Sequence, residues 1–158
     1  MYHAYLIAHF LLMLLWIIPA MVSDYRFLVH FRTGSREQKI GVVKRIQALS
    51  GKTEMVASFF VPLVGILLLI QQSFWLKEGV MHAKILLALV AIGSYHASRG
   101  KLKTLLNALE SGDSTEGLPR RYMLLRSLTL ILLVGIVWLI TSFKGAITTL
   151  NLIRSWFG

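Results

Sequence analysis

Long apolar runs separated by shorter polar segments dominate the chain. Four such runs cover residues 4–22, 55–70, 80–95 and 122–143. A helix needs about 20 apolar residues to cross a bilayer, and each run reaches that length by itself or with its flanking residues. We therefore predict an all-α, polytopic membrane four-helix bundle that forms a single transmembrane domain over residues 1–158.

The first apolar run has none of the basic residues that open a cleaved signal peptide, because no Lys or Arg precedes Arg26. We interpret it as a retained helix that continues helically towards His30, with Pro19 as a point of kinking. Ser35 is a plausible helix start. The basic amphipathic stretch that follows is either a helix on the membrane surface or the early part of the second span.

The turn between the second and third runs is short, at residues 77–79. Spans two and three are therefore expected to be antiparallel neighbours. Of the 158 residues, 56% are hydrophobic, which exceeds the share usual in a soluble domain.

The net charge of +10 is concentrated in two of the polar segments. The first holds Arg26, Arg32, Arg36, Lys39, Lys44, Arg45 and Lys52, and the second holds Arg99, Lys101, Lys103, Arg120, Arg121 and Arg126. This distribution follows the positive-inside rule, which predicts that both segments are cytoplasmic and both termini lie outside. We expect a multi-pass protein of a bacterial inner membrane, with the lipid bilayer and not nucleic acid as its charged partner.

Four histidines are the most informative polar residues of the apolar runs. His82 and His96 are 14 residues apart, and His9 and His30 are 21 apart. At 100° per residue the members of each pair fall on one face of a continuous helix, offset by about 40° and about 60°. An imidazole is costly to place in a membrane helix, so each is a candidate functional residue.

If spans one and three pack together, the histidines form an outer pair, His9 with His82, and an inner pair, His30 with His96. Such an arrangement is what a membrane cytochrome needs. The axial separations differ, at about 21 Å in span three and about 31 Å in span one. The mismatch affects the inner pair, so His9 and His82 are the predicted metal ligands. Satisfied interhelical hydrogen bonds are the alternative reading.

Nearby cations extend this candidate site. Lys84 near the outer pair, and Arg26 and Arg99 near the inner pair, can bind a carboxylate such as a porphyrin propionate. Snorkelling and membrane topology are the alternative explanations. The chain has no cysteine, which excludes thiolate metal sites, iron–sulfur clusters and covalently attached haem.

Several short motifs surround the histidines. They are His9-Phe10 followed by Trp16, then Arg26-Phe27-Leu28-Val29-His30, Met81-His82-Ala83-Lys84, and Tyr95-His96 with Arg99. Their order and spacing resemble those of the HemJ-type protoporphyrinogen IX oxidases and the related CopD-like membrane proteins. The resemblance implies haem b, bound around His9, His30, His82, Lys84 and His96, and oxidation of protoporphyrinogen IX. The N-E-x-P motif of that family is replaced here by residues 124–128, so the catalytic residues stay unassigned.

The prediction is therefore a haem b-binding integral membrane redox protein, with porphyrin biosynthesis as its implied setting. An alternative of another class is a non-catalytic subunit or assembly factor of a larger respiratory or transport complex. Its histidines would then be structural, and its apolar faces would contact partners. A homo-oligomer that shields the site is a further expectation. A metal permease is disfavoured because the six methionines are scattered.

Overall fold

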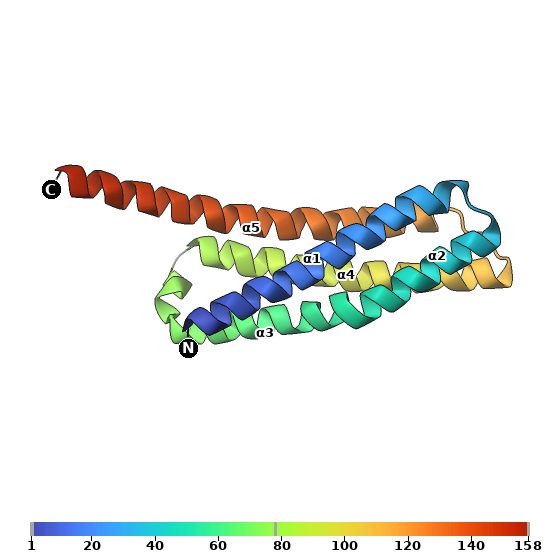
Figure 1. Ribbon diagram of the computed structural model, residues 1–158, viewed down its shortest axis with the longest axis horizontal. Helices are drawn as coiled ribbons and strands as arrows, with labels where there is room; N and C mark the ends of the chain where they lie inside the picture. The colour runs from blue at the N-terminus through green and yellow to red at the C-terminus, as the bar shows by residue number, and fades with distance from the viewer. Residues whose placement is uncertain (1, 78, 158) are drawn as a thin grey trace.

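The computed structural model describes residues 2–77 and 79–157, leaving out the side chains of 74, 75, 140 and 143–157. Its elements are the helices α1 (Tyr2–Thr33), α2 (Arg36–Leu49), α3 (Met55–Gln71), α4 (Gly79–Ser111) and α5 (Leu118–Phe157), with a π-helical segment η1 (Ser50–Glu54) and a 3-10 segment η2 (Ser73–Lys77). Four helices in this part of the chain are long and apolar enough to cross a membrane. The all-α bundle with four candidate spans is thus confirmed (Figure 1).

The second spanning helix is a continuous rod of 36 residues made of α2, η1 and α3. It begins with a capping box, in which the Gln38 N–H donates to Ser35 Oγ and the Ser35 N–H donates to Gln38 Oε1 at 2.9 Å. The predicted start at Ser35 is therefore confirmed. The basic stretch after it packs against α1 and α4, so the alternative of a separate surface helix is wrong.

All four spanning helices reach past the apolar runs at the end of the bundle that carries the 34–35 and 112–117 connections (Figure 1). We call this the basal end, and the end that carries η2 the apical end. The basal end has its own core, made of Phe27, Phe31, Val43, Ile46, Leu102, Leu105, Leu106, Leu109 and Tyr122. The predicted continuation of the first helix to His30 is confirmed, because α1 ends at Thr33.

The C-terminus of α4 is fixed by a side chain from α2. Arg36 donates from Nε to the Leu109 carbonyl at 2.7 Å and from Nη2 to the Glu110 carbonyl at 3.1 Å. These carbonyls have no partner within the helix, so Arg36 satisfies them. Gly112 ends the helix with φ +86°, and a Cβ there would lie 3.2 Å from Arg36 Nη2. Glycine adopts this left-handed backbone conformation without strain, and it leaves room for the Arg36 guanidinium.

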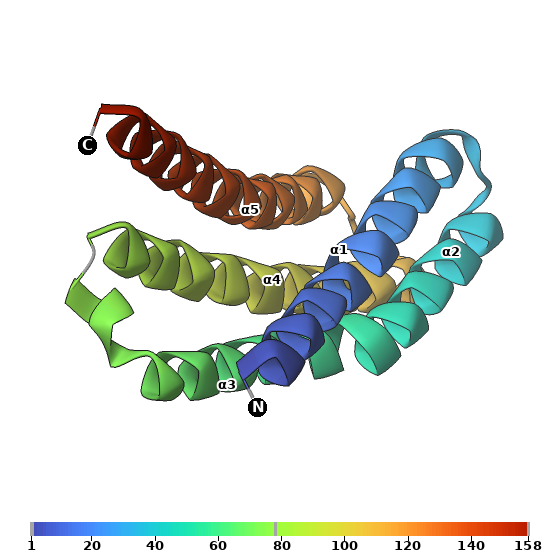
Figure 2. The same ribbon diagram turned by 60° about the vertical axis from the view of Figure 1, so that its left-hand side comes forward.

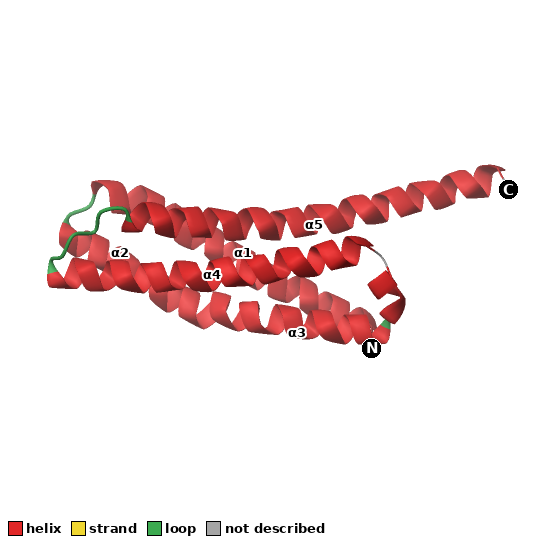
Figure 3. Ribbon diagram, turned by 180° about the vertical axis from the view of Figure 1, so that it is seen from behind, coloured by secondary structure: helices red, strands yellow, loops and turns green. Residues whose placement is uncertain are grey.

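Helix pairing is uneven in the apical half. There α1 packs on α3, whereas α4 packs most extensively on α5 (Figure 2). Among the described residues α1 and α4 do not pack along their lengths, although Trp16 and Tyr95 meet edge to face with ring centroids 5.6 Å apart. The two helices α3 and α4 are antiparallel, as predicted (Figure 3). They are not closely packed on each other, and a groove lies between them.

The first residues of α1 and the last of α5 point to the same, apical, end of the bundle (Figure 1). Four crossings return the chain to the side of the membrane on which it began. The predicted fourth span, 122–143, lies within α5, which continues to Phe157.

Truncating the basal core should destabilise the bundle. Leu105 is 0% exposed, and Leu105→Ala should cost about 2–5 kcal/mol because it leaves a cavity. The matched control is Leu86→Ala on the same helix, since Leu86 is 62% exposed. Denaturant unfolding in micelles, followed by circular dichroism, compares the two. Equal losses of stability would show that the basal core is not packed as described.

Candidate functional site

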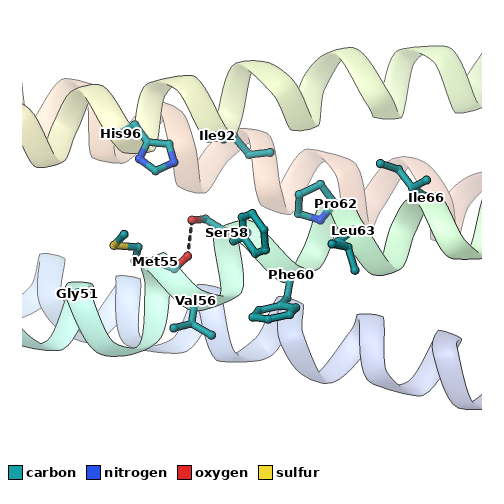
Figure 4. Close-up of a pocket in the computed structure, with 11 residues that line it drawn as sticks. Gly51, Met55, Val56, Ser58, Phe60, Pro62, Leu63, Ile66, Ile92 and His96 are labelled. Carbon is teal, nitrogen blue, oxygen red and sulfur yellow. Dashed lines mark hydrogen bonds between the residues drawn. The ribbon is translucent and has the colours of Figure 1, made fainter.

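An apolar groove of about 640 Å³ runs between α3 and α4. Its walls include Phe60, Leu63 and Ile66 of α3, and Ile92 of α4 (Figure 4). Phe59 of α3 also lines it. This volume lies in the range of about 300–1,000 Å³ that is usual for small-molecule and cofactor sites. The groove exists because α3 pairs with α1 and α4 pairs with α5, which leaves the facing sides of α3 and α4 uncovered.

His96 of α4 is the imidazole that lines this groove, one helical turn from Ile92 (Figure 4). It is solvent-exposed in the absence of lipid, and its ring lies 5.2 Å from that of Tyr95, edge to face. The other polar side chain of the lining, Ser58, donates to the Met55 carbonyl of its own helix at 2.9 Å. His96 therefore supplies the ligating nitrogens of the groove within the described part of the chain.

Arg99 stands at the basal end of the groove. A Cβ on Gly51, which lines the groove, would lie 3.6 Å from Arg99 Nη2. The guanidinium of α4 thus reaches across to η1, less than a turn along α4 from His96. Within the described residues it forms no salt bridge. An imidazole and a guanidinium at one end of an apolar groove suit an amphiphile that carries an acidic group.

A buried ionic triad lies on the other side of η1, inside the bundle. Arg126 of α5 donates from Nε to Asp24 Oδ1 of α1 at 2.8 Å and from Nη1 to Glu54 Oε2 of η1 at 2.5 Å. Its Nη2 donates to the Ala20 carbonyl at 3.1 Å. The Arg126 side chain is 2% exposed, which makes it one of the largest fully buried side chains. One guanidinium therefore joins three helical elements.

The π-helical geometry of η1 explains why its residues face in two directions. A π-helical turn is wider than an α-helical turn and changes the direction of the residues around it, and such turns are frequent at functional sites. Glu54 points inward and accepts a hydrogen bond from Ser23 Oγ at 3.4 Å. Ser50 is also buried, and the Tyr95 hydroxyl donates to its carbonyl at 3.2 Å. Gly51 lies on the outer side, in the groove lining.

Arg126 was predicted to be one of the cations of the second polar segment, and this prediction is wrong, because the residue is buried within α5. Its partners Asp24 and Glu54 lie 102 and 72 residues away, so only packing reveals the triad. A signal did exist. Asp24 and Glu54 are the acidic residues at the borders of the apolar runs, and a charge in such a position demands a partner.

The outer histidines occupy different surroundings. His9 of α1 is half-buried, and its Cε1 would lie 3.3 Å from a Cβ on Gly65 of α3. Its Nδ1 is enclosed without a hydrogen-bond partner in the described part of the chain. The α4 charge that acts on His9 is that of Lys84. His82 is exposed and lies about 200° around α4 from Lys84, the residue whose charge acts on His9. The similar depth of His9 and His82 in the bundle therefore does not bring the two imidazoles together.

The remaining predicted site residues, His30 and Arg26, are exposed on α1 near the basal end and do not line the groove. Among the described residues, no group of three or more His, Cys, Asp and Glu side chains is arranged to hold a metal ion. The structure thus places His9 where the charge of Lys84 acts on it, and His96 and Arg99 at one end of the groove.

No protein-family model, curated protein or solved structure matches this chain. The likeness to HemJ-type proteins therefore rests on the short motifs alone.

Replacing Arg126 tests the triad. Arg126→Met leaves the buried carboxyls of Asp24 and Glu54 without a cation, which should cost about 3–5 kcal/mol. The control is Lys44→Met, which breaks the 2.7 Å ion pair between Lys44 and Glu110. These two side chains are 58% and 44% exposed, respectively. That loss should be within about 1 kcal/mol. Unfolding midpoints in micelles give the comparison, and a stable Arg126→Met protein would contradict the buried triad.

Proposed function

We propose that this protein binds haem b in the α3–α4 groove and acts in membrane redox chemistry. The observation that carries the proposal is the placement of His96 and Arg99 at one end of an apolar groove about 640 Å³ in volume. Haem combines the three features that such a site recognises: an apolar macrocycle, an iron that accepts imidazole nitrogen, and acidic propionates.

The residues present fit this group. His96 offers an imidazole to the iron, and packing against Tyr95 orients its ring. Arg99 can hold a propionate through a charge-assisted hydrogen bond. The apolar walls, with Phe59 and Phe60, exclude water and thereby influence the reduction potential. When bound, haem b supplies one-electron transfer; the chain holds it, orients it and keeps it dry.

The groove itself offers one imidazole. His82 lies on nearly the same face of α4, but about 21 Å further towards the apical end, too far to bind the same iron. We therefore propose a single protein ligand to the iron in this groove. His82, exposed near the apical end, is available to a second porphyrin or to a neighbouring copy of the chain.

Porphyrinogen oxidation is the reaction implied by the motif resemblance, and the same groove would accept that substrate class. For orientation, we propose a bacterial inner membrane with the basal end in the cytoplasm and both termini outside. The support is the exposed basic surface of the basal end, which includes Lys44, Arg45, Lys103, Arg120 and Arg121.

Removing the His96 imidazole tests haem ligation. The protein purified in detergent and supplied with haem should show a Soret band and, after reduction, an α band. His96→Ala should lower haem affinity by about 10–100-fold and shift both bands. His30→Ala, an exposed histidine of α1, is the matched control and should change neither. A wild-type protein without either band would end the proposal, as would a His96→Ala variant with an unchanged spectrum.

The cation at the groove end is tested separately. Arg99→Gln should weaken haem binding by roughly tenfold or more, because a charge-assisted hydrogen bond contributes about 1.5–3 kcal/mol. The positions of the absorption bands should stay as in the wild type, since the iron ligand is retained. Arg26→Gln is the matched control on α1. Fluorescence-quenching titration with haem measures both, and equal affinities would remove Arg99 from the site.

A further inference from the structure

The ionic triad is unbalanced in charge. Asp24 and Glu54 each carry a negative charge when ionised, and Arg126 carries one positive charge, so the fully ionised triad has a net charge of −1. The three side chains are 9%, 0% and 2% exposed, respectively. An uncompensated charge in such a dry position is strongly unfavourable, and a buried carboxyl avoids it by holding a proton.

No other described cation bonds directly to this triad. The groups packed around it are Ser23 from α1, Ser50 from η1, Tyr95 from α4 and Tyr122 from α5. The two phenols are neutral at physiological pH. Arg99 lies on the groove side of η1, beside Gly51. The excess negative charge therefore has to be met within the triad.

The two carboxyl groups are not equivalent. Glu54 accepts hydrogen bonds from two Arg126 nitrogens, at 2.5 and 3.4 Å, and a third from Ser23 Oγ. Hydrogen-bond donors stabilise a charged carboxylate, and three of them converge on Glu54. Asp24 accepts one bond, through Oδ1, and keeps some contact with solvent.

We infer that Asp24 is a proton-binding group and that the triad is a pH-sensitive junction between α1, η1 and α5. With the Asp24 carboxyl protonated, the triad is neutral. When the pH rises, the carboxyl O–H bond breaks, the proton passes to water, and the triad acquires its net charge of −1. The ionised Asp24 then repels Glu54 across Arg126 and loosens the contact of α1 with η1.

Infrared spectroscopy of the protein without haem tests the inference, independently of the proposed cofactor. At about pH 7 a solvent-exposed aspartate is ionised. The wild type should nevertheless show the C=O stretch of one protonated carboxylic acid, shifted in D2O and lost as the pH is raised. Asp24→Asn should remove this band, and Glu110→Gln, at an exposed acid of α4, should leave it in place.

A second variant keeps the test decisive. Glu54→Gln removes one negative charge and leaves Asp24 and Arg126 as a neutral ion pair. Asp24 should then ionise, and the band should disappear although Asp24 is still present. Circular dichroism verifies that each variant is folded. The inference is overturned if the wild type lacks the band, if Asp24→Asn retains it, or if Glu54→Gln retains it at neutral pH.

Discussion

The buried guanidinium of Arg126 is the constraint on which the bundle depends. A charge that is 2% exposed is tolerated only if it is paired and hydrogen-bonded, and the partners of Arg126, itself on α5, come from α1 and η1. The helices can therefore adopt only the axial positions and rotations that bring Asp24, Glu54 and the Ala20 carbonyl together. Apolar helix faces alone would permit several such alignments in a membrane. The triad selects one.

The π-helical segment connects this constraint to the groove. One short stretch of the second spanning rod turns Ser50 and Glu54 into the bundle and leaves Gly51 on the outside, beside Arg99. The ionic junction and the groove thus share a wall. Any movement of η1 that accompanies a change of charge on Asp24 would also move the groove end at which Arg99 stands. The proposed proton site and the proposed porphyrin site share this segment, so each can influence the other.

The groove itself results from which helices pair. Because α1 packs on α3 and α5 packs on α4, the apical halves of α3 and α4 face each other without close packing. The apolar lining there is compatible with lipid, with a partner chain or with a bound macrocycle. The feature that favours a macrocycle is the single imidazole of His96, which lines the groove together with Ile92 and the phenylalanines of α3.

The sequence by itself determined the four spans, the helix start at Ser35 and the shared face of His82 and His96, because helical periodicity and capping depend on residues close in the chain. It also pointed to Arg99 as a cation for an acidic group. Only the tertiary structure decided that Arg126 is buried against Asp24 and Glu54. It also decided that the α4 residue whose charge acts on His9 is Lys84 and not His82. These contacts join residues many tens of positions apart. They depend on how the helices rotate and pair, which the local sequence pattern does not encode.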